Sequence, residues 1–74
     1  STDVIESNDA VLVINLEKHG VKNYIGGATF LEMYDAFRLG KKIYLYNDVP
    51  DGILQDEIIG FDPIVLDGDL EKIK

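Results

Sequence analysis

The chain has 74 residues, of which 46 % are apolar and 28 % charged, and it contains no cysteine and no tryptophan. A chain of this length buries one small core, which excludes a two-domain enzyme. Fourteen acidic residues against seven basic ones give a net charge of −7, so we expect no binding to nucleic acid, whose phosphates the chain repels. The apolar run at 10–14 is far shorter than the ~20 residues that span a bilayer, so we expect no membrane segment.

Few residues of the chain could form a disulfide or bind a metal ion. Without cysteine there is no disulfide framework and no thiolate metal site, and a single histidine, His19, does not build a zinc site by itself. We therefore expect a cytoplasmic protein that holds no metal.

Apolar patterning predicts three strands and two helices that alternate along the chain. Residues 2–7 are interpreted as the last turns of a helix. The strands are expected at about 10–16, 42–46 and 64–66, and the helices at about 28–39 and 53–61. The first strand is apolar at successive positions, as is typical of a strand covered on both faces. This order predicts an α/β fold with a parallel sheet.

The longer helix has a clear apolar face and a clear end. Phe30, Met33, Tyr34 and Phe37 follow the helical spacing of one face, which we expect to pack on the sheet. Gly40 stands where a C-terminal cap glycine belongs.

One face of the predicted sheet lacks a covering element. Right-handed crossovers place both helices on the same face, and only residues 1–7 and 69–74 remain for the other. We therefore expect that face to be covered by a missing N-terminal half, a second copy of the chain or a rearranged terminus. The chain starts at Ser1 without an initiator methionine or a signal peptide, so we also expect its start to be a cut end.

The carboxyl edge of the sheet is the expected place for a ligand, as in other open α/β folds. Asn15 follows the first strand, and Gly26-Gly27 precedes the longer helix at the same edge. A glycine pair there allows backbone N–H groups to approach a phosphate or sugar oxygen, although such pairs are more often plain turns.

Thr29 and Glu32 have two interpretations, and the sequence does not decide between them. Their spacing is that of a capping box, in which each side chain accepts a hydrogen bond from a backbone N–H at the helix start. Alternatively, a glutamate in the first helical turn is kept ionised by the helix dipole and can act as a nucleophile or base.

The tyrosines divide by position. Tyr24 lies in a polar loop and is the one that we expect to contact a ligand. Tyr34, Tyr44 and Tyr46 lie on apolar elements and are expected in the core. His19, between Lys18 and Gly20, is expected to be an exposed loop residue.

Residues 9–14 (DAVLVI), 26–32 (GGATFLE) and 36–43 (AFRLGKKI) resemble the C-terminal half of the nucleoside 2-deoxyribosyltransferase family. The resemblance covers most of the chain. It implies a three-layer, flavodoxin-like (Rossmann-like) fold with a parallel sheet, in which these strands are the last three. It also implies that residues 1–74 form a single domain that lacks the first strand and glycine-rich first loop of the family, and that is inactive by itself.

The same resemblance implies a reaction. The family transfers or hydrolyses the N-glycosidic bond of (deoxy)nucleosides or nucleotides without a cofactor, and its glutamate nucleophile corresponds to Glu32. The residues expected to bind substrate are Gly26, Gly27, Thr29, Tyr24 and Asn15. The implied partners are a small-molecule nucleoside or nucleotide, and a second copy of the chain or an N-terminal half.

Departures from the family pattern leave alternatives open. Ala28 replaces a glycine, and Tyr34 occupies the position of a small glycine two residues after the nucleophile, where it would narrow the pocket. Residues 26–32 also resemble the motif P-G-G-x-G-T-x-x-E of nucleotide phosphoribohydrolases, with Ile25 in the proline position. A non-catalytic nucleotide-binding or structural domain of the same fold is the third possibility.

Overall fold

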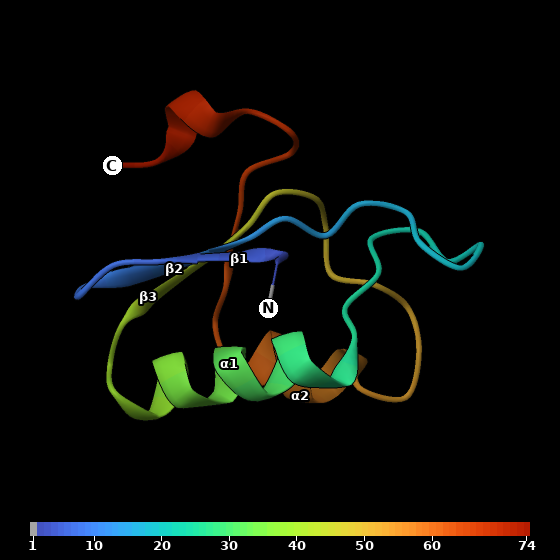
Figure 1. Ribbon diagram of the computed structural model, residues 1–74, viewed down its shortest axis with the longest axis horizontal. Helices are drawn as coiled ribbons and strands as arrows, with labels where there is room; N and C mark the ends of the chain where they lie inside the picture. Colours follow the sequence, from blue (N-terminus) through green and yellow to red (C-terminus); the bar gives the residue numbers. More distant parts are fainter. Residues whose placement is uncertain (1) are drawn as a thin grey trace.

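The computed structural model describes residues 2–74 as a four-stranded sheet with two α-helices on one face (Figure 1). The elements in chain order are β1 (Val4–Glu6), β2 (Ala10–Val13), α1 (Gly27–Arg38), β3 (Lys42–Leu45), α2 (Gln55–Gly60), β4 (Ile64–Val65) and the 3-10 helix η1 (Leu70–Lys72). The strands lie side by side in the order β1-β2-β3-β4. Within these described residues, no helix is long and apolar enough to cross a membrane.

The sheet is mixed, which corrects the expected three-layer, flavodoxin-like parallel sheet. Strands β2, β3 and β4 are parallel as expected, but β1 runs antiparallel to β2, with Ile5 opposite Leu12. Apart from the C-terminal segment, no layer covers the second face in the described part of the chain. The fold is therefore a small α/β sheet with one helical layer.

The expected helix at residues 2–7 is also wrong, and the turn that follows explains why. The Ser7 N–H donates to the Ala10 carbonyl at 2.9 Å, and the Ser7 hydroxyl accepts a hydrogen bond from the Ala10 N–H at 3.2 Å. This closes a tight turn that folds Val4 and Ile5 back along β2. Two β-branched residues in so short a segment gain more from a strand ladder than from an isolated helical turn.

Both helices pack on the same face of the sheet, as the right-handed crossovers predict (Figure 1). The buried core between the layers consists of Val11, Val13, Ile43 and Leu45 from the sheet, Met33 and Ala36 from α1, and Ile58 from α2. These strand residues alternate along β2 and β3, so one face of each strand packs against the helices.

The buried face of α1 is rotated from the expected one. Thr29, Met33 and Ala36 face the sheet. Phe30 and Phe37 instead contact the ring of Phe61, which follows α2, with ring centroids 5.2 and 5.5 Å apart. The sequence pattern marked the apolar side of α1 correctly but did not distinguish the residues under the sheet from those beside α2.

The end of α1 agrees with the sequence prediction. Gly40 has a φ of +72°, a left-handed conformation that favours glycine. The Gly40 N–H donates to the Phe37 carbonyl, and the Lys41 N–H donates to the Ala36 carbonyl at 2.9 Å. These two bonds form a Schellman motif, which satisfies carbonyl groups that the helix end leaves free.

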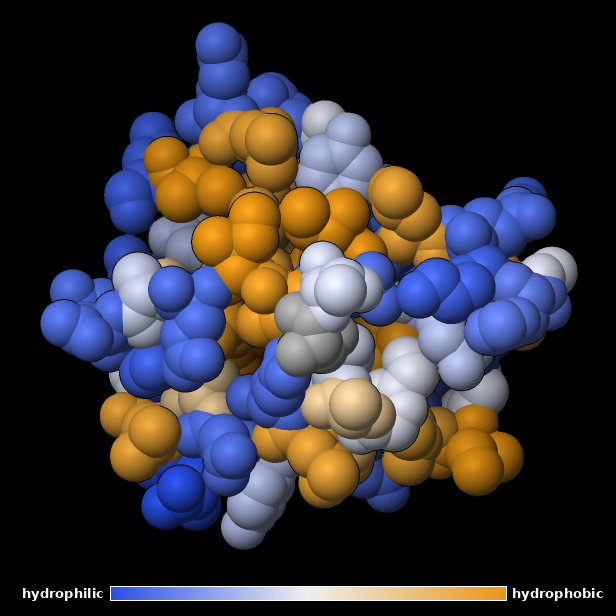
Figure 2. Space-filling model, viewed as in Figure 1, coloured by the Kyte–Doolittle hydropathy of each residue, from blue (hydrophilic) through white to orange (hydrophobic). Residues whose placement is uncertain are grey.

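The face opposite the helices is covered in part by the C-terminal segment. Tyr44 is buried there, in the core as expected, and its hydroxyl donates to the Lys74 carbonyl at 3.4 Å. Ile73 borders an apolar groove together with Ile5 and Leu12, and Ile5 remains 59 % exposed. Figure 2 shows apolar side chains gathered between η1 and β1. Coverage by a second copy or an N-terminal half stays a prediction.

Candidate functional site

The loop between β2 and α1 has a defined turn at its tip, although its sequence shows no periodicity. The N–H groups of Lys18 and Val21 each donate to the carbonyl of the other residue, at 3.1 and 2.9 Å. The two residues between them, His19 and Gly20, have φ values of +55° and +73°. Positive φ at both central positions is typical of a type I′ turn. His19 is exposed at this tip, as expected.

Tyr24 is held where this loop enters α1. Its N–H donates to the Leu16 carbonyl at 3.0 Å, and its ring meets the ring of His19 edge-on at 5.3 Å. A Cβ atom on Gly26 would lie 3.3 Å from Cε2 of Tyr24, tighter than most packed contacts. Glycine at position 26 thus allows the tyrosine ring to lie across the start of the helix.

The capping box expected from Thr29 and Glu32 is not formed. Helix α1 begins at Gly27, with Gly26 as its N-cap and no side-chain cap hydrogen bond. Thr29 is therefore the third helical residue, and Glu32 lies in the second turn instead of the first. The helix starts earlier because Gly26 is extended and its carbonyl already accepts the Phe30 N–H at 2.9 Å.

Glu32 lies on the flank of α1 that faces away from α2. An α-helix turns about 100° per residue, so Glu32 is about 200° from Phe30, whose ring contacts Phe61 beside α2. The Glu32 side chain is half-buried, and its Oε2 atom has no contact with solvent. Thr29, one turn earlier, is buried against the sheet.

Asn15 joins the carboxyl ends of β2 and β3. The side chain is 1 % exposed. Its Oδ1 accepts the Asn47 N–H at 2.8 Å, and its Nδ2 donates to the carbonyls of Asn47 and Asp48 at 3.2 and 3.0 Å. The Asn15 amide is therefore occupied within the protein, and it contributes to a site by holding the two loops together.

A signal for this pairing is present in the sequence. Val13 pairs with Leu45 across β2 and β3, and each asparagine follows its strand by the same two residues. Asn47 returns the interaction, because its Nδ2 donates to the Asn15 carbonyl at 3.2 Å. Sequence reasoning placed Asn15 at this edge of the sheet but missed its contact with Asn47.

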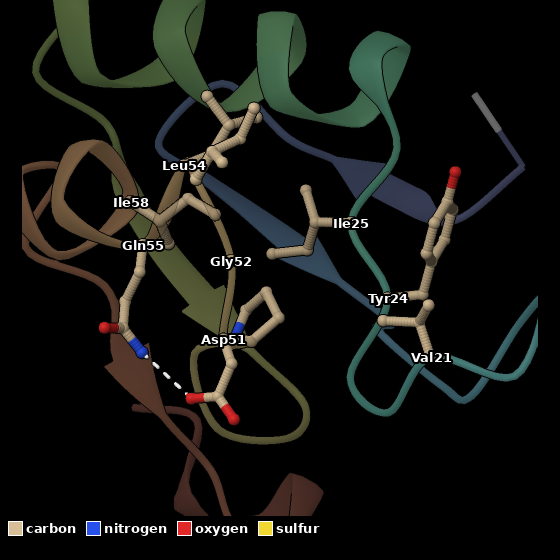
Figure 3. A pocket seen from close by; sticks show the side chains of 10 residues that line it. Val21, Tyr24, Ile25, Asp51, Gly52, Leu54, Gln55 and Ile58 are labelled. Atoms are coloured by element: carbon tan, nitrogen blue, oxygen red, sulfur yellow. Dashed lines mark hydrogen bonds between the residues drawn. The ribbon is translucent and has the colours of Figure 1, made fainter.

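Sequence reasoning also missed a cavity of about 190 Å³ between the β2–α1 loop and the segment that leads into α2 (Figure 3). Ile25, Leu54 and Ile58 line it on one side. Asp51 and Gln55 lie together on another, joined by a hydrogen bond from Nε2 of Gln55 to Oδ1 of Asp51 at 3.1 Å. Glu32 does not line this cavity.

A second hollow, of about 200 Å³, lies nearer to β1. It is lined by Ile14, Leu16 and Tyr24, together with Asp3 and Lys18. The carboxylate of Asp3 and the ammonium of Lys18 form an ion pair at 3.3 Å across part of this hollow. Tyr24, the tyrosine that we expected to contact a ligand, borders both hollows and therefore lies at a concave surface.

No family model, curated protein or solved structure matches this chain. Within residues 2–74, no group of three or more histidine, aspartate or glutamate side chains is arranged to hold a metal ion. The site is therefore interpreted from its own geometry.

Proposed function

We propose that the protein containing this chain acts on the N-glycosidic bond of a (deoxy)nucleoside or nucleotide, by transfer or hydrolysis, with Glu32 as the nucleophile. One observation carries the proposal. Glu32 extends from the helix that begins at the carboxyl edge of the sheet, and one of its carboxylate oxygens is shielded from solvent. Glutamate side chains are mostly exposed in folded proteins, so a shielded carboxylate on this helix is a candidate reactive group.

The proposed reaction proceeds in two displacements. An oxygen of Glu32 forms a bond to C1′ of the sugar while the bond from C1′ to the base nitrogen breaks. The base leaves with the bonding electrons and takes up a proton from solvent. Water or a second base then attacks C1′, loses a proton and restores the Glu32 carboxylate, as in retaining glycosidases.

The neighbouring groups fit supporting roles in this proposal. The Tyr24 ring lies at the helix start and offers a flat apolar face to a base. The N–H groups of Gly27 and Ala28 belong to the first turn of α1, where no intrahelical acceptor exists, and they suit a sugar or phosphate oxygen. Thr29, buried one turn before Glu32, positions the glutamate.

Tyr34 leaves the flank that carries Glu32 open. The sequence led us to expect that Tyr34 packs in the core or narrows the pocket. It is instead 47 % exposed and lies about 200° around α1 from Glu32. Its ring faces Phe61, with centroids 6.5 Å apart.

The proposal is tested by base release and by trapping the covalent adduct. The complete gene product is purified and incubated with 2′-deoxynucleosides and their 5′-monophosphates, free base is separated by chromatography, and the intact protein mass is measured. We expect base release and a mass increase of one deoxyribosyl group, both lost in Glu32→Gln. Glu57→Gln makes the same change at an exposed glutamate on α2 and should retain both.

Two results would contradict the proposal: no base release from any nucleoside or nucleotide, or equal rates for the wild type and Glu32→Gln. A second candidate, nucleotide binding without reaction, is favoured by the cavity at Tyr24 that Glu32 does not line. Saturable nucleoside binding that Tyr24→Leu weakens, without any base release, would support that candidate.

A further inference from the structure

We propose that β1 is a docking edge, at which a second copy of this chain adds its own β1 in antiparallel orientation and continues the sheet. Strand β1 is the first strand of the sheet, and within residues 2–74 no strand pairs with its outer side (Figure 1). An open strand edge presents N–H and C=O groups to which another strand can bind. Glu32 takes no part in this pairing, so the proposal does not depend on the N-glycosidic reaction.

The hydrogen bonds between β1 and β2 show which backbone groups of β1 face outward. The Ile14 N–H donates to the Asp3 carbonyl at 2.8 Å, so this pair of residues is hydrogen-bonded. Hydrogen-bonded and non-hydrogen-bonded pairs alternate along an antiparallel ladder, so the backbone of Ile5 faces β2 as well. The N–H and C=O groups of Val4 and Glu6 therefore point away from β2, toward the open edge.

These outward groups are complementary to the same groups of a second copy. When a two-fold axis passes between the Ile5 residues of two copies, Val4 of each copy lies opposite Glu6 of the other. The two pairs then form four backbone hydrogen bonds. Ile5 lies opposite Ile5 of the second copy as a non-hydrogen-bonded pair, in which side chains approach most closely. The other edge strand, β4, has two residues and offers fewer such groups.

The apolar surface that remains uncovered lies at this same edge. Ile5 is 59 % exposed, and with Leu12 and Ile73 it borders a groove of about 210 Å³ on the face opposite the helices. Figure 2 shows the apolar side chains between η1 and β1. The C-terminal segment already contacts Tyr44, so the surface left to cover is a strip beside β1. An added β1 places its own Ile5 against this strip.

The distribution of charge favours β1 over β4 for the approach of a second acidic chain. Residues 48–71, which include β4, contain eight acidic residues and no basic one. At β1 the carboxylates are neutralised within the chain. Glu6 forms an ion pair with Lys41 at 2.7 Å, and Asp3 forms one with Lys18 at 3.3 Å. Two copies therefore repel each other less at β1 than at the other edge.

The pairing also brings the second copy to one of the concave surfaces. In this register Ser7 of the second copy lies opposite Asp3, which lines the hollow that Tyr24 borders. The turn at Ser7 of each copy thus lies beside the hollow of the other, and the pair contains two equivalent hollows.

Sedimentation equilibrium of the complete gene product, over a series of protein concentrations, tests the association. We expect the mass of two chains. In a dimer formed from ¹³C-labelled and unlabelled copies, we also expect a nuclear Overhauser effect between the Ile5 methyl groups of the two copies. A monomer at every concentration, or a dimer without this effect, overturns the proposal.

Two pairs of variants locate the interface. Glu6→Pro removes an outward N–H and leaves the bonds to β2, since an edge strand tolerates proline, and should raise the dissociation constant at least about tenfold. Glu6→Ala removes the same carboxylate but keeps the N–H, and should change the constant less than about twofold.

The second pair of variants tests the centre of the interface. Ile5→Lys places two ammonium groups opposite each other and should also raise the dissociation constant at least about tenfold. Ile59→Lys makes the same change on α2, at a side chain that is 56 % exposed, and should retain the dimer. Circular dichroism shows whether each variant is folded. A dimer that persists in both Glu6→Pro and Ile5→Lys overturns the proposal.

Discussion

Replacing Asn15 by alanine should destabilise the fold strongly, although it removes only one small polar side chain. In the native structure the Asn15 amide makes three hydrogen bonds to the backbone of Asn47 and Asp48 at 2.8 to 3.2 Å. Alanine leaves the Asn47 N–H and two carbonyls without these partners at a position that is 1 % exposed. Of the hydrogen bonds between Asn15 and the loop after β3, only the one from Nδ2 of Asn47 to the carbonyl of residue 15 then remains.

The expected cost follows from the number of bonds and their burial. A typical hydrogen bond contributes about 1 kcal/mol net, and a buried group left without a partner costs roughly 1–3 kcal/mol. Asp48 is an exposed residue, so we expect water to replace part of the bond that its carbonyl loses. We therefore expect the free energy of unfolding to fall by about 2–3 kcal/mol, a large share of the roughly 4–11 kcal/mol typical of a chain this size.

Urea unfolding monitored by circular dichroism at 25 °C measures this change. Asn8→Ala removes an exposed asparagine before β2 and should alter the free energy of unfolding by less than about 0.5 kcal/mol. Asn15→Asp keeps the shape but places a carboxylate against two carbonyl oxygens, so it should destabilise at least as much as alanine. If Asn15→Ala lowers the free energy by less than about 0.5 kcal/mol with an unchanged m value, the structural role assigned to Asn15 is incorrect.

Two further predictions concern the helix α1. Gly40→Ala places a Cβ on a residue with a φ of +72° and should lower the free energy of unfolding by about 1 kcal/mol. Gly27→Ala should be neutral or stabilising, because the backbone there is helical and no atom lies within 4 Å of the added Cβ. Thermal unfolding of both variants measures the difference, and equal effects would contradict the prediction. Met33→Ala creates a cavity at a fully buried position and should lower the free energy of unfolding by about 2–5 kcal/mol. Leu31→Ala, at a side chain that is 63 % exposed, should lower it by less than about 1 kcal/mol. Similar decreases for the two variants in urea unfolding would show that α1 packs by a different face.

The sequence prediction succeeded where a structural feature depends on residues that are close together in the chain. A glycine with left-handed φ ends α1 at Gly40, because the residue type and the helix end are neighbours in the chain. The alternation of strands and helices and the shared face of α1 and α2 follow from apolar patterning and from the handedness of crossovers. The burial of Tyr44 follows from its place in a strand that is apolar on both faces.

The errors occur where two distant segments compete for the same surface. Val4–Glu6 became an antiparallel edge strand because the turn at Ser7 returns it along β2, and no pattern within three residues reports such a pairing. Similarly, α1 turns Thr29 instead of Phe30 toward the sheet because Phe61, from beyond α2, takes up the aromatic side chains.

The candidate site shows the same division. The sequence by itself determined which residues could carry chemistry, because Glu32, Tyr24 and the glycine pair at the start of α1 are defined by type and spacing. Only the tertiary structure decided what each of them faces. Asn15 is engaged by a loop that lies 32 residues further along the chain, and the cavity at Asp51 exists only because that loop folds against the one after β2. Contacts between such distant segments depend on the closing of the whole sheet, and local sequence does not encode them.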